Sequence, residues 1–209
     1  MAVVLILLVV AQLVLPGIAE QQLRDRLNRS GRVESVHVSA FPAIELLWND
    51  ADRVVVRMRN YHSGTGHLGS LLSEAGGVGS LDASAGVLTA GLLTVHDAVF
   101  QKRGDRVSAT AAVTEADLRS AIPVLDSVVP VGSGNGELTV QGTVTLFGVT
   151  ATVDATARAQ NGQIVVTPDV PLGGFATITV FSNPAVEVQG VAANPTPTGF
   201  TVSAVGRIR

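Results

Sequence analysis

The side chains of this sequence that could carry out chemistry begin with four histidines: His37, His62, His67 and His96. His62 and His67 are five residues apart, whereas two histidines that bind zinc from one helix are four apart. His37 and His96 fall on separate expected strands, and no spacing links them. The histidines therefore predict no metal site, and we expect them to be surface or core residues.

A glycine-rich segment at residues 64–69 reads GTGHLG and matches the GxGxxG pattern of dinucleotide-binding turns. It lies between an expected strand and a short expected helix, Leu68–Ala75. That helix is barely two turns long, and no acidic residue ends a second parallel strand at the usual distance. The pattern therefore favours a tight turn, and we expect no cofactor.

Residues for hydrolytic chemistry are sparse. His96 and Asp97 could orient an imidazole toward a serine, but the sequence contains no GxSxG, and neighbours on a strand point to opposite faces. The acids are few and dispersed; Asp117 is expected to cap a helix, and Glu45 is the one acid in a strongly apolar stretch. We expect a protein that is not an enzyme, with an esterase as the most distant alternative.

The composition excludes several further classes of protein. The chain has 209 residues, of which 46% are hydrophobic and only 15% charged, against about 25% charged in a typical soluble protein. Dispersed basic residues, a net charge of −3 and 4% aromatic residues argue against a nucleic-acid partner. The absence of cysteine excludes disulfides and thiolate metal sites. The length suits a single domain with a short appendage.

The N-terminal segment from Ala2 to Ala19 is almost continuously apolar, interrupted only by Gln12 and Pro16. Its length is at the lower limit for spanning a bilayer, so residues 1–19 are expected to form a membrane anchor or signal segment. A slight preference goes to an uncleaved anchor, because no positively charged region precedes the apolar run. The expected location is the cell envelope, with the exported chain tethered to the outer face of the plasma membrane or lying in a periplasm-like space. Residues 20–31 are expected to form a juxtamembrane helix that stops at Gly31.

Residues 32–209 change to an alternating pattern that is typical of strands. A capping-box pattern at Thr114 and Asp117 predicts a helix that continues to Ser127. The segment Asn194–Gly199 is expected to be a loop or an edge crossing, because its prolines cannot donate to a sheet. The predicted fold is mainly β (α+β): an antiparallel, elongated, curled sheet or barrel with one or two packed helices. The expected strands are Val33–Val38, Arg53–Tyr61, Leu92–Phe100, Arg106–Val113, Glu137–Phe147, Val149–Ala159, Gln163–Thr167, Phe175–Phe181, Ala185–Val191 and Phe200–Ile208.

The long strands have one apolar face, which must be covered by something apolar. Two modest helices are too few to do so, which leaves closure of the sheet on itself into a barrel or a ligand that covers the apolar face. The expected acyl-chain contacts come from the strand Glu137–Phe147 and the helix at Thr114: Leu138, Val140, Val144, Leu118, Ile122 and Leu125. The stretch FPAIELLW is either a core plug or an apolar lip near the opening, through Phe41, Pro42, Ile44, Leu46, Leu47 and Trp48. The competing class is a structural or protein-binding envelope domain with a self-filled β core.

Several short motifs together resemble one family. They are the polar helix EQQLRDRL, the strand and proline stretch VHVSAFPAIELLW, the strand DRVVVRMRN, the helix start Val113-Thr114-Glu115-Ala116-Asp117-Leu118 and the closing strand Gly199-Phe200-Thr201-Val202. The sequence is similar to the LmeA-like phospholipid-binding proteins of actinobacterial cell envelopes, although Ala43 stands where the family often has a bulky residue.

The resemblance covers nearly the whole chain. It implies an elongated β fold similar to the tubular lipid-binding proteins, with anionic phospholipid or a membrane as partner. It also implies a role in lipid transfer or in lipoglycan and envelope maintenance. It carries over no catalytic residue.

Overall fold

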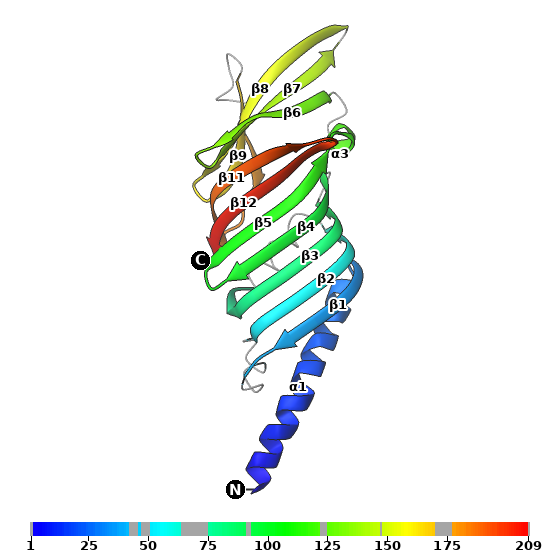
Figure 1. Cartoon of the computed structure of the whole chain (residues 1–209), viewed down its shortest axis with the longest axis vertical. Helices are drawn as coiled ribbons and strands as arrows, with labels where there is room; N and C mark the ends of the chain where they lie inside the picture. Colours follow the sequence, from blue (N-terminus) through cyan, green and yellow to red (C-terminus); the bar gives the residue numbers. More distant parts are fainter. Residues whose placement is uncertain are drawn as a thin grey trace.

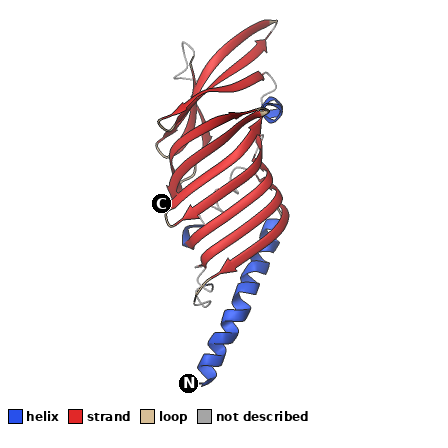
Figure 2. Cartoon of the chain, viewed as in Figure 1, coloured by secondary structure: helices blue, strands red, loops and turns tan. Residues whose placement is uncertain are grey.

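A computed structural model describes residues 2–41, 46, 51–63, 75–90, 93–121, 125–146, 148–169 and 177–208. The molecule is elongated (Figure 1). A long N-terminal helix projects from one end, a seven-stranded sheet forms the middle, and a five-stranded sheet forms the other end. Strands dominate, and the short helix α3 (Glu115–Ala121) lies where the two sheets meet (Figure 2).

The seven-stranded sheet has the order β1-β2-β3-β4-β5-β12-β11, and the five-stranded sheet has the order β10-β9-β8-β7-β6. The remaining described elements are the helix α1 (Ala2–Asn28) and the short 3-10 helix η2 (Ala75–Gly77). The strands are β1 (Gly31–Ser39), β2 (Ala51–Ser63), β3 (Val78–Ala90), β4 (Leu93–Arg103), β5 (Arg106–Thr114), β6 (Leu125–Gly134), β7 (Glu137–Leu146), β8 (Val149–Gln160), β9 (Gln163–Pro168), β10 (Ile178–Phe181), β11 (Val186–Thr196) and β12 (Gly199–Ile208).

The predicted mainly β fold with packed helices is confirmed. Of the two predicted forms, the curled sheet is right and the barrel is wrong. In the described residues β1 and β11 are the two ends of the seven-stranded sheet and do not pair with each other.

Helix α1 is one continuous element that includes the expected apolar segment and the expected juxtamembrane helix, with Pro16 inside it. It ends at Asn28, and Gly31 begins β1 after a two-residue turn. Leu27 is buried against the seven-stranded sheet, whereas Ile18 is half exposed. Where the structure describes the chain, no helix combines the length and hydropathy needed to cross a membrane.

Strand β3 was not expected, and its pairing corrects the prediction of a purely antiparallel sheet. It runs parallel to β2, with Val54 opposite Leu81. Parallel neighbours need a crossover of about a dozen residues or more, which the 64–77 segment supplies. The sequence VGSLDASAGVLTA hides this strand because glycine, serine, aspartate and alanine have low strand propensity. The expected helix Leu68–Ala75 lies almost wholly outside the described residues.

The helix predicted from Thr114 to Ser127 is too long. Helix α3 ends at Ala121, and a strand, β6, begins at Leu125. The capping signal itself is confirmed, since Asp117 N donates to Thr114 Oγ1 at 3.2 Å and Thr114 N donates to Asp117 Oδ2 at 3.3 Å. Local capping therefore fixed where the helix starts, while the valines after Leu125 pair with β7 in the five-stranded sheet.

Of the two forms expected for Asn194–Gly199, the structure favours the edge position over the loop, since the segment is the tip of the hairpin between β11 and β12. Asn194 pairs with Thr201 and Thr196 with Gly199, so the strands continue almost to the turn. Pro195 is tolerated because β11 is an edge strand of its sheet, where a missing N–H breaks no ladder.

Two clusters of buried side chains make up the core. The first, called the junction cluster here, lies between the sheets and includes Val107, Val113, Leu138, Val188 and Phe200. The second, called the helix cluster, joins α1 to β1, β2 and β3. Its buried residues are Leu27, Val36, Val38, Ala51, Val54, Val56, Met58 and Tyr61.

Strand β11 holds the two sheets together through its backbone. On one side it pairs with β12. On the other side it bonds to turns of the five-stranded sheet: Val188 N donates to Gly162 O, and Val191 N donates to Gly136 O, both at 3.0 Å. Ala193 N donates to Ser133 Oγ at 3.1 Å. Its valines thereby cover the apolar face of β7 and β8, so protein rather than ligand fills that part of the fold.

Candidate functional site

The expected contact residues are distributed over both core clusters. Leu138 is buried in the junction cluster, and Leu118 and Val140 pack against it. Val144 lies further along β7 and is half-buried. Leu46 packs against the helix cluster.

The other expected residues are exposed or not described. Phe41 is 80% exposed. Leu125 begins β6, and its side chain lies outside the described part of the chain, as do Pro42, Ile44, Leu47, Trp48 and Ile122, as well as Glu45 and the GTGHLG segment. The structure thus brings together the contacts predicted on β7 and α3, and separates them from Leu46.

One face of the seven-stranded sheet carries the buried residues of both clusters and is called the inner face here. Strand pairing aligns its side chains in rows that cross the sheet from β2 to β11. One row contains Val54, Leu81, Lys102, Val107, Gly206 and Val188. The next contains Val56, Ala83, Phe100, Ala109, Ala204 and Val191. These two rows are apolar from β2 to β11 except at Lys102.

The middle of the inner face is lined with alanine. Ala98 on β4, with Ala109 and Ala111 on β5, are half-buried and belong to neither core cluster. These three residues, called the alanine strip here, lie where the sheet passes from one cluster to the other. Small side chains leave the volume above a strand unfilled, and the distance from β2 to β12 is roughly 20 Å at normal strand spacing. The strip itself lies on two adjacent strands, and core residues of the two clusters flank it on either side.

Lys102 is the cation of the inner face, and only 3% of it is exposed. Its ammonium group donates to the carbonyl oxygens of Val78 and Gly76, at the start of β3. Burial lowers the pKa of Lys102, and the charge of Asp105 opposes that shift only in part. Among the described residues no carboxylate forms an ion pair with it, so a positive charge lies at one end of an otherwise apolar face.

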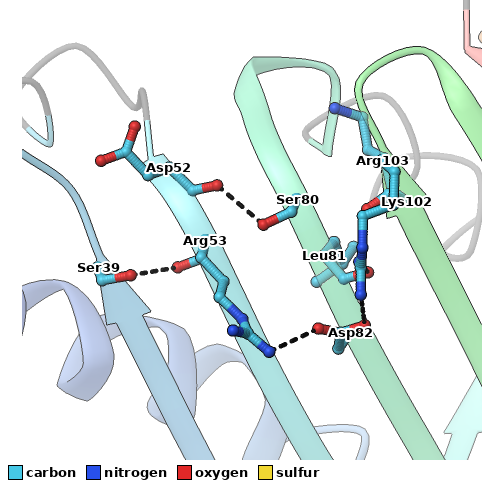
Figure 3. A network of polar contacts seen from close by, with 8 residues as sticks. All are labelled: Ser39, Asp52, Arg53, Ser80, Leu81, Asp82, Lys102 and Arg103. Atoms are coloured by element: carbon cyan, nitrogen blue, oxygen red, sulfur yellow. Dashed lines mark hydrogen bonds and ion pairs between the residues drawn. The ribbon is translucent and has the colours of Figure 1, made fainter.

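The opposite, outer face of the sheet is polar and held by ion pairs (Figure 3). Asp82 on β3 accepts from Arg103 on β4 at 2.5 Å and from Arg53 on β2 at 3.2 Å. The hydrogen bond from Arg103, with the charges of both guanidinium groups, lowers the pKa of Asp82. Arg59 and Glu34 form a further pair at 3.2 Å between β2 and β1. The sheet is thus one-sided, with solvent-facing charges behind the apolar inner face.

We expect the ion pairs of Asp82 to make the fold acid-sensitive. Because the pKa of Asp82 is lower in the folded chain than in the unfolded chain, the pairs stabilise the fold above about pH 4 and are lost as the pH falls through the folded-state pKa. Asp82→Asn should cost about 1 kcal/mol at pH 7 after allowance for solvent screening, and the penalty should shrink toward pH 3. Chemical denaturation between pH 7 and pH 3 measures this.

The control for this prediction is Asp126→Asn. Asp126 on β6 is exposed and forms no ion pair with any described residue, so the loss of its charge should leave the free energy of unfolding unchanged at either pH. Equal effects of the two variants at pH 7, or an Asp82→Asn penalty that does not depend on pH, would contradict the assignment.

His96 is paired, but not with the neighbouring Asp97. Its Nε2 lies 3.0 Å from Asp117 Oδ2, which ties β4 to the start of α3. Partial burial raises the pKa of Asp117, but the hydrogen bonds from Thr114 and the contact with His96 outweigh this and lower it. Within the described residues no group of histidines and acids could hold a metal ion. The arrangement is that of a capped helix start.

Sequence reasoning missed the alanine strip. The alternation of Val107, Ala109, Ala111 and Val113 was visible, and β5 was predicted as a strand. The pattern does not show which residues lie beside these alanines on the adjacent strands. Small residues on a strand become informative only when their cross-strand partners are known. The signal available was the size contrast within β5, in which valines flank two alanines on the same face.

Comparison with known proteins gives one match. A family model described as LmeA-like phospholipid-binding matches residues 8–205 of the chain. No curated protein and no solved structure matches it.

Proposed function

Since the chain belongs to the LmeA-like phospholipid-binding family, we propose that it binds phospholipid with the acyl chains against the alanine strip of the inner face. The observation that carries this proposal is the half-buried alanine surface between two separately filled core clusters. Each methylene group removed from water contributes about 0.8 kcal/mol. A single acyl chain lying along the strip would therefore gain enough to bind without any directed polar contact.

Two finer features of the proposal concern the lipid and its place in the cell. The buried ammonium group of Lys102, which has only neutral partners among the described residues, favours an anionic phospholipid on the inner face. The apolar sequence Ala2–Ala19 favours export to the cell envelope, with residues 1–19 as anchor or signal. We propose lipid transfer or envelope and lipoglycan maintenance as the role there, with no catalytic step.

The test uses the full chain, because Leu23 and Leu27 of α1 belong to the core and a chain shortened to Gly31 would lose them. The protein is purified in detergent, and bound lipid is extracted and identified by mass spectrometry. We expect about one phospholipid per chain, and enrichment of anionic over zwitterionic species when the protein is incubated with mixed vesicles. A chain that is folded and carries no phospholipid before or after incubation would contradict the proposal and favour a self-filled structural domain.

A further inference from the structure

A shallow recess of about 560 Å³, wide open to solvent, lies where α1 ends and β1 begins, away from the alanine strip. It is lined by Asn28, Gly31, Arg32, Arg59, Asn60 and Val87. Four of these six side chains are polar, and none of them is acidic. Arg32 is also the last of four closely spaced arginines that begin at Arg24. The recess is therefore distinct in chemistry from the apolar surface to which acyl chains are assigned.

Both amide side chains in the recess have their oxygens occupied. Asn60 Oδ1 accepts a hydrogen bond from Arg32 N at 3.1 Å, and Asn28 Oδ1 accepts one from Val33 N at 3.3 Å. A carboxamide whose oxygen is engaged in this way presents its NH₂ group to any further partner. The two asparagines thus contribute donors to the recess, fixed in orientation by the backbone of β1.

Both guanidinium groups also retain free donors. Arg59 uses its Nε for Glu34 at 3.2 Å, which leaves its two terminal nitrogens without a partner in the described part of the chain. The Arg32 side chain forms no ion pair with any described residue. Two positive charges therefore face the recess, with a single carboxylate beside one of them.

Gly31 keeps these donors close together. A Cβ at this position would lie 2.1 Å from the carbonyl oxygen of Asn60, so the backbones of β1 and β2 approach as closely as only glycine permits. This close approach brings Asn60, on β2, next to Asn28 at the end of α1. The recess is thus built by the same contact that joins the helix to the sheet.

We propose that this recess binds a phosphate group, through the two guanidinium groups and the two carboxamide NH₂ groups. Two guanidinium groups and two amide NH₂ groups, with each amide oxygen already accepting a bond from the backbone, match a tetrahedral anion that has several acceptor oxygens, and the two positive charges repel cations. The same chemistry is offered by the phosphodiester of a lipid headgroup and by inorganic phosphate. This site goes beyond the proposed function, since it does not depend on acyl chains occupying the inner face.

The first experiment titrates the purified full chain with inorganic phosphate and follows binding by calorimetry and ³¹P NMR. Asn60→Asp retains the oxygen that accepts from Arg32 N and replaces only the free NH₂ by a carboxylate oxygen, so the fold should persist. We expect phosphate affinity to fall about tenfold or more in Asn60→Asp and in the double variant Arg32→Gln/Arg59→Gln. Arg57→Gln is the matched control, because Arg57 lies two residues from Arg59 on β2 and outside the recess.

A second arm separates the two sources of the phosphate. The same variants are tested for sedimentation with vesicles of phosphatidylglycerol and with vesicles of phosphatidylcholine. Loss of phosphatidylglycerol binding in Asn60→Asp but not in Arg57→Gln supports a lipid headgroup in the recess; loss of binding to inorganic phosphate alone supports the free anion. The proposal is overturned if Asn60→Asp and the double variant change neither, or if Arg57→Gln weakens binding as much as they do. Extracted lipid is measured in parallel, so failure of acyl binding is recognised separately.

Discussion

Replacing Ala109 and Ala111 by leucine is expected to reduce the phospholipid that copurifies with the chain by about tenfold or more. Both alanines lie on the inner face of β5, in the gap between the two core clusters. The added methyl groups would occupy the space above the strip that the acyl chain requires, and the loss of several buried methylene groups at about 0.8 kcal/mol each accounts for the effect. Mass spectrometry of extracted lipid from equal amounts of folded protein measures it.

The matched control is Thr110→Leu. Thr110 lies between the two alanines on the same strand, but it faces outward and is exposed. Lipid loading in this variant should equal that of the natural sequence.

The double variant also separates the two classes of function that the sequence leaves open. In a domain whose core is filled by its own side chains, the added leucines would overpack the core and cost about 1–3 kcal/mol each. In a lipid-binding domain the lipid-free chain should be no less stable than the natural one. Strong destabilisation together with unchanged lipid loading would refute the assignment of the strip.

Gly206→Ala is expected to destabilise the seven-stranded sheet strongly. A Cβ at this position would lie 2.5 Å from the carbonyl oxygen of Glu187 and 3.2 Å from the Cα of Val188. Both atoms belong to the backbone of β11, which cannot move aside without disturbing its bonds to the five-stranded sheet. We expect a loss of about 2–3 kcal/mol of unfolding free energy. For a chain of this size that corresponds to a fall in Tm of about 5–10 °C, measured by circular dichroism.

Gly134→Ala is the control for this variant. A Cβ at Gly134 has no neighbour within 4 Å, and the residue is exposed at the end of β6. The same chemical change should there be neutral or slightly stabilising, because alanine reduces the freedom of the unfolded chain. If the two variants had equal Tm values, the close approach of β11 and β12 would not be a constraint on the fold.

The elements of this fold that neighbouring residues determine were predicted from the sequence, and those that tertiary contacts determine were missed. Hairpins such as β8–β9, with the turn Asn161-Gly162, were predicted because neighbouring residues determine them. The end of α3 was missed because the switch to a strand at Leu125 depends on pairing with β7, which is a tertiary contact. Strand β3 was missed because its weak strand propensity is overcome only by its two neighbours in the sheet.

The candidate site was harder to predict from the sequence than the fold was. Leu138 and Val140 were correctly identified as facing an apolar layer, but the layer proved to be β11, from the other sheet. Sequence reasoning looked for large apolar residues, whereas the alanine strip is defined by small ones. The phosphate recess depends on two hydrogen bonds to backbone N–H groups, and those bonds determine that the asparagines present donors. The valine and alanine alternation of β5 is visible along the chain, but its cross-strand neighbours and the hydrogen bonds of the recess are tertiary contacts that the sequence does not show.

The separation of the two core clusters has a consequence for how the chain opens. Apolar burial determines local resistance to hydrogen exchange, and alanine contributes little of it. The amides of β4 and β5 near Ala98, Ala109 and Ala111 should therefore exchange through local opening of these two strands. During that opening α1 stays packed on the sheet at one end, and β11 keeps its bonds to the five-stranded sheet at the other. The molecule would then behave as two cooperative units that share a weakly coupled sheet. A hydrocarbon chain bound across the middle of the sheet would contact both units. The molecule with bound lipid should therefore be stiffer along its long axis than the molecule without it.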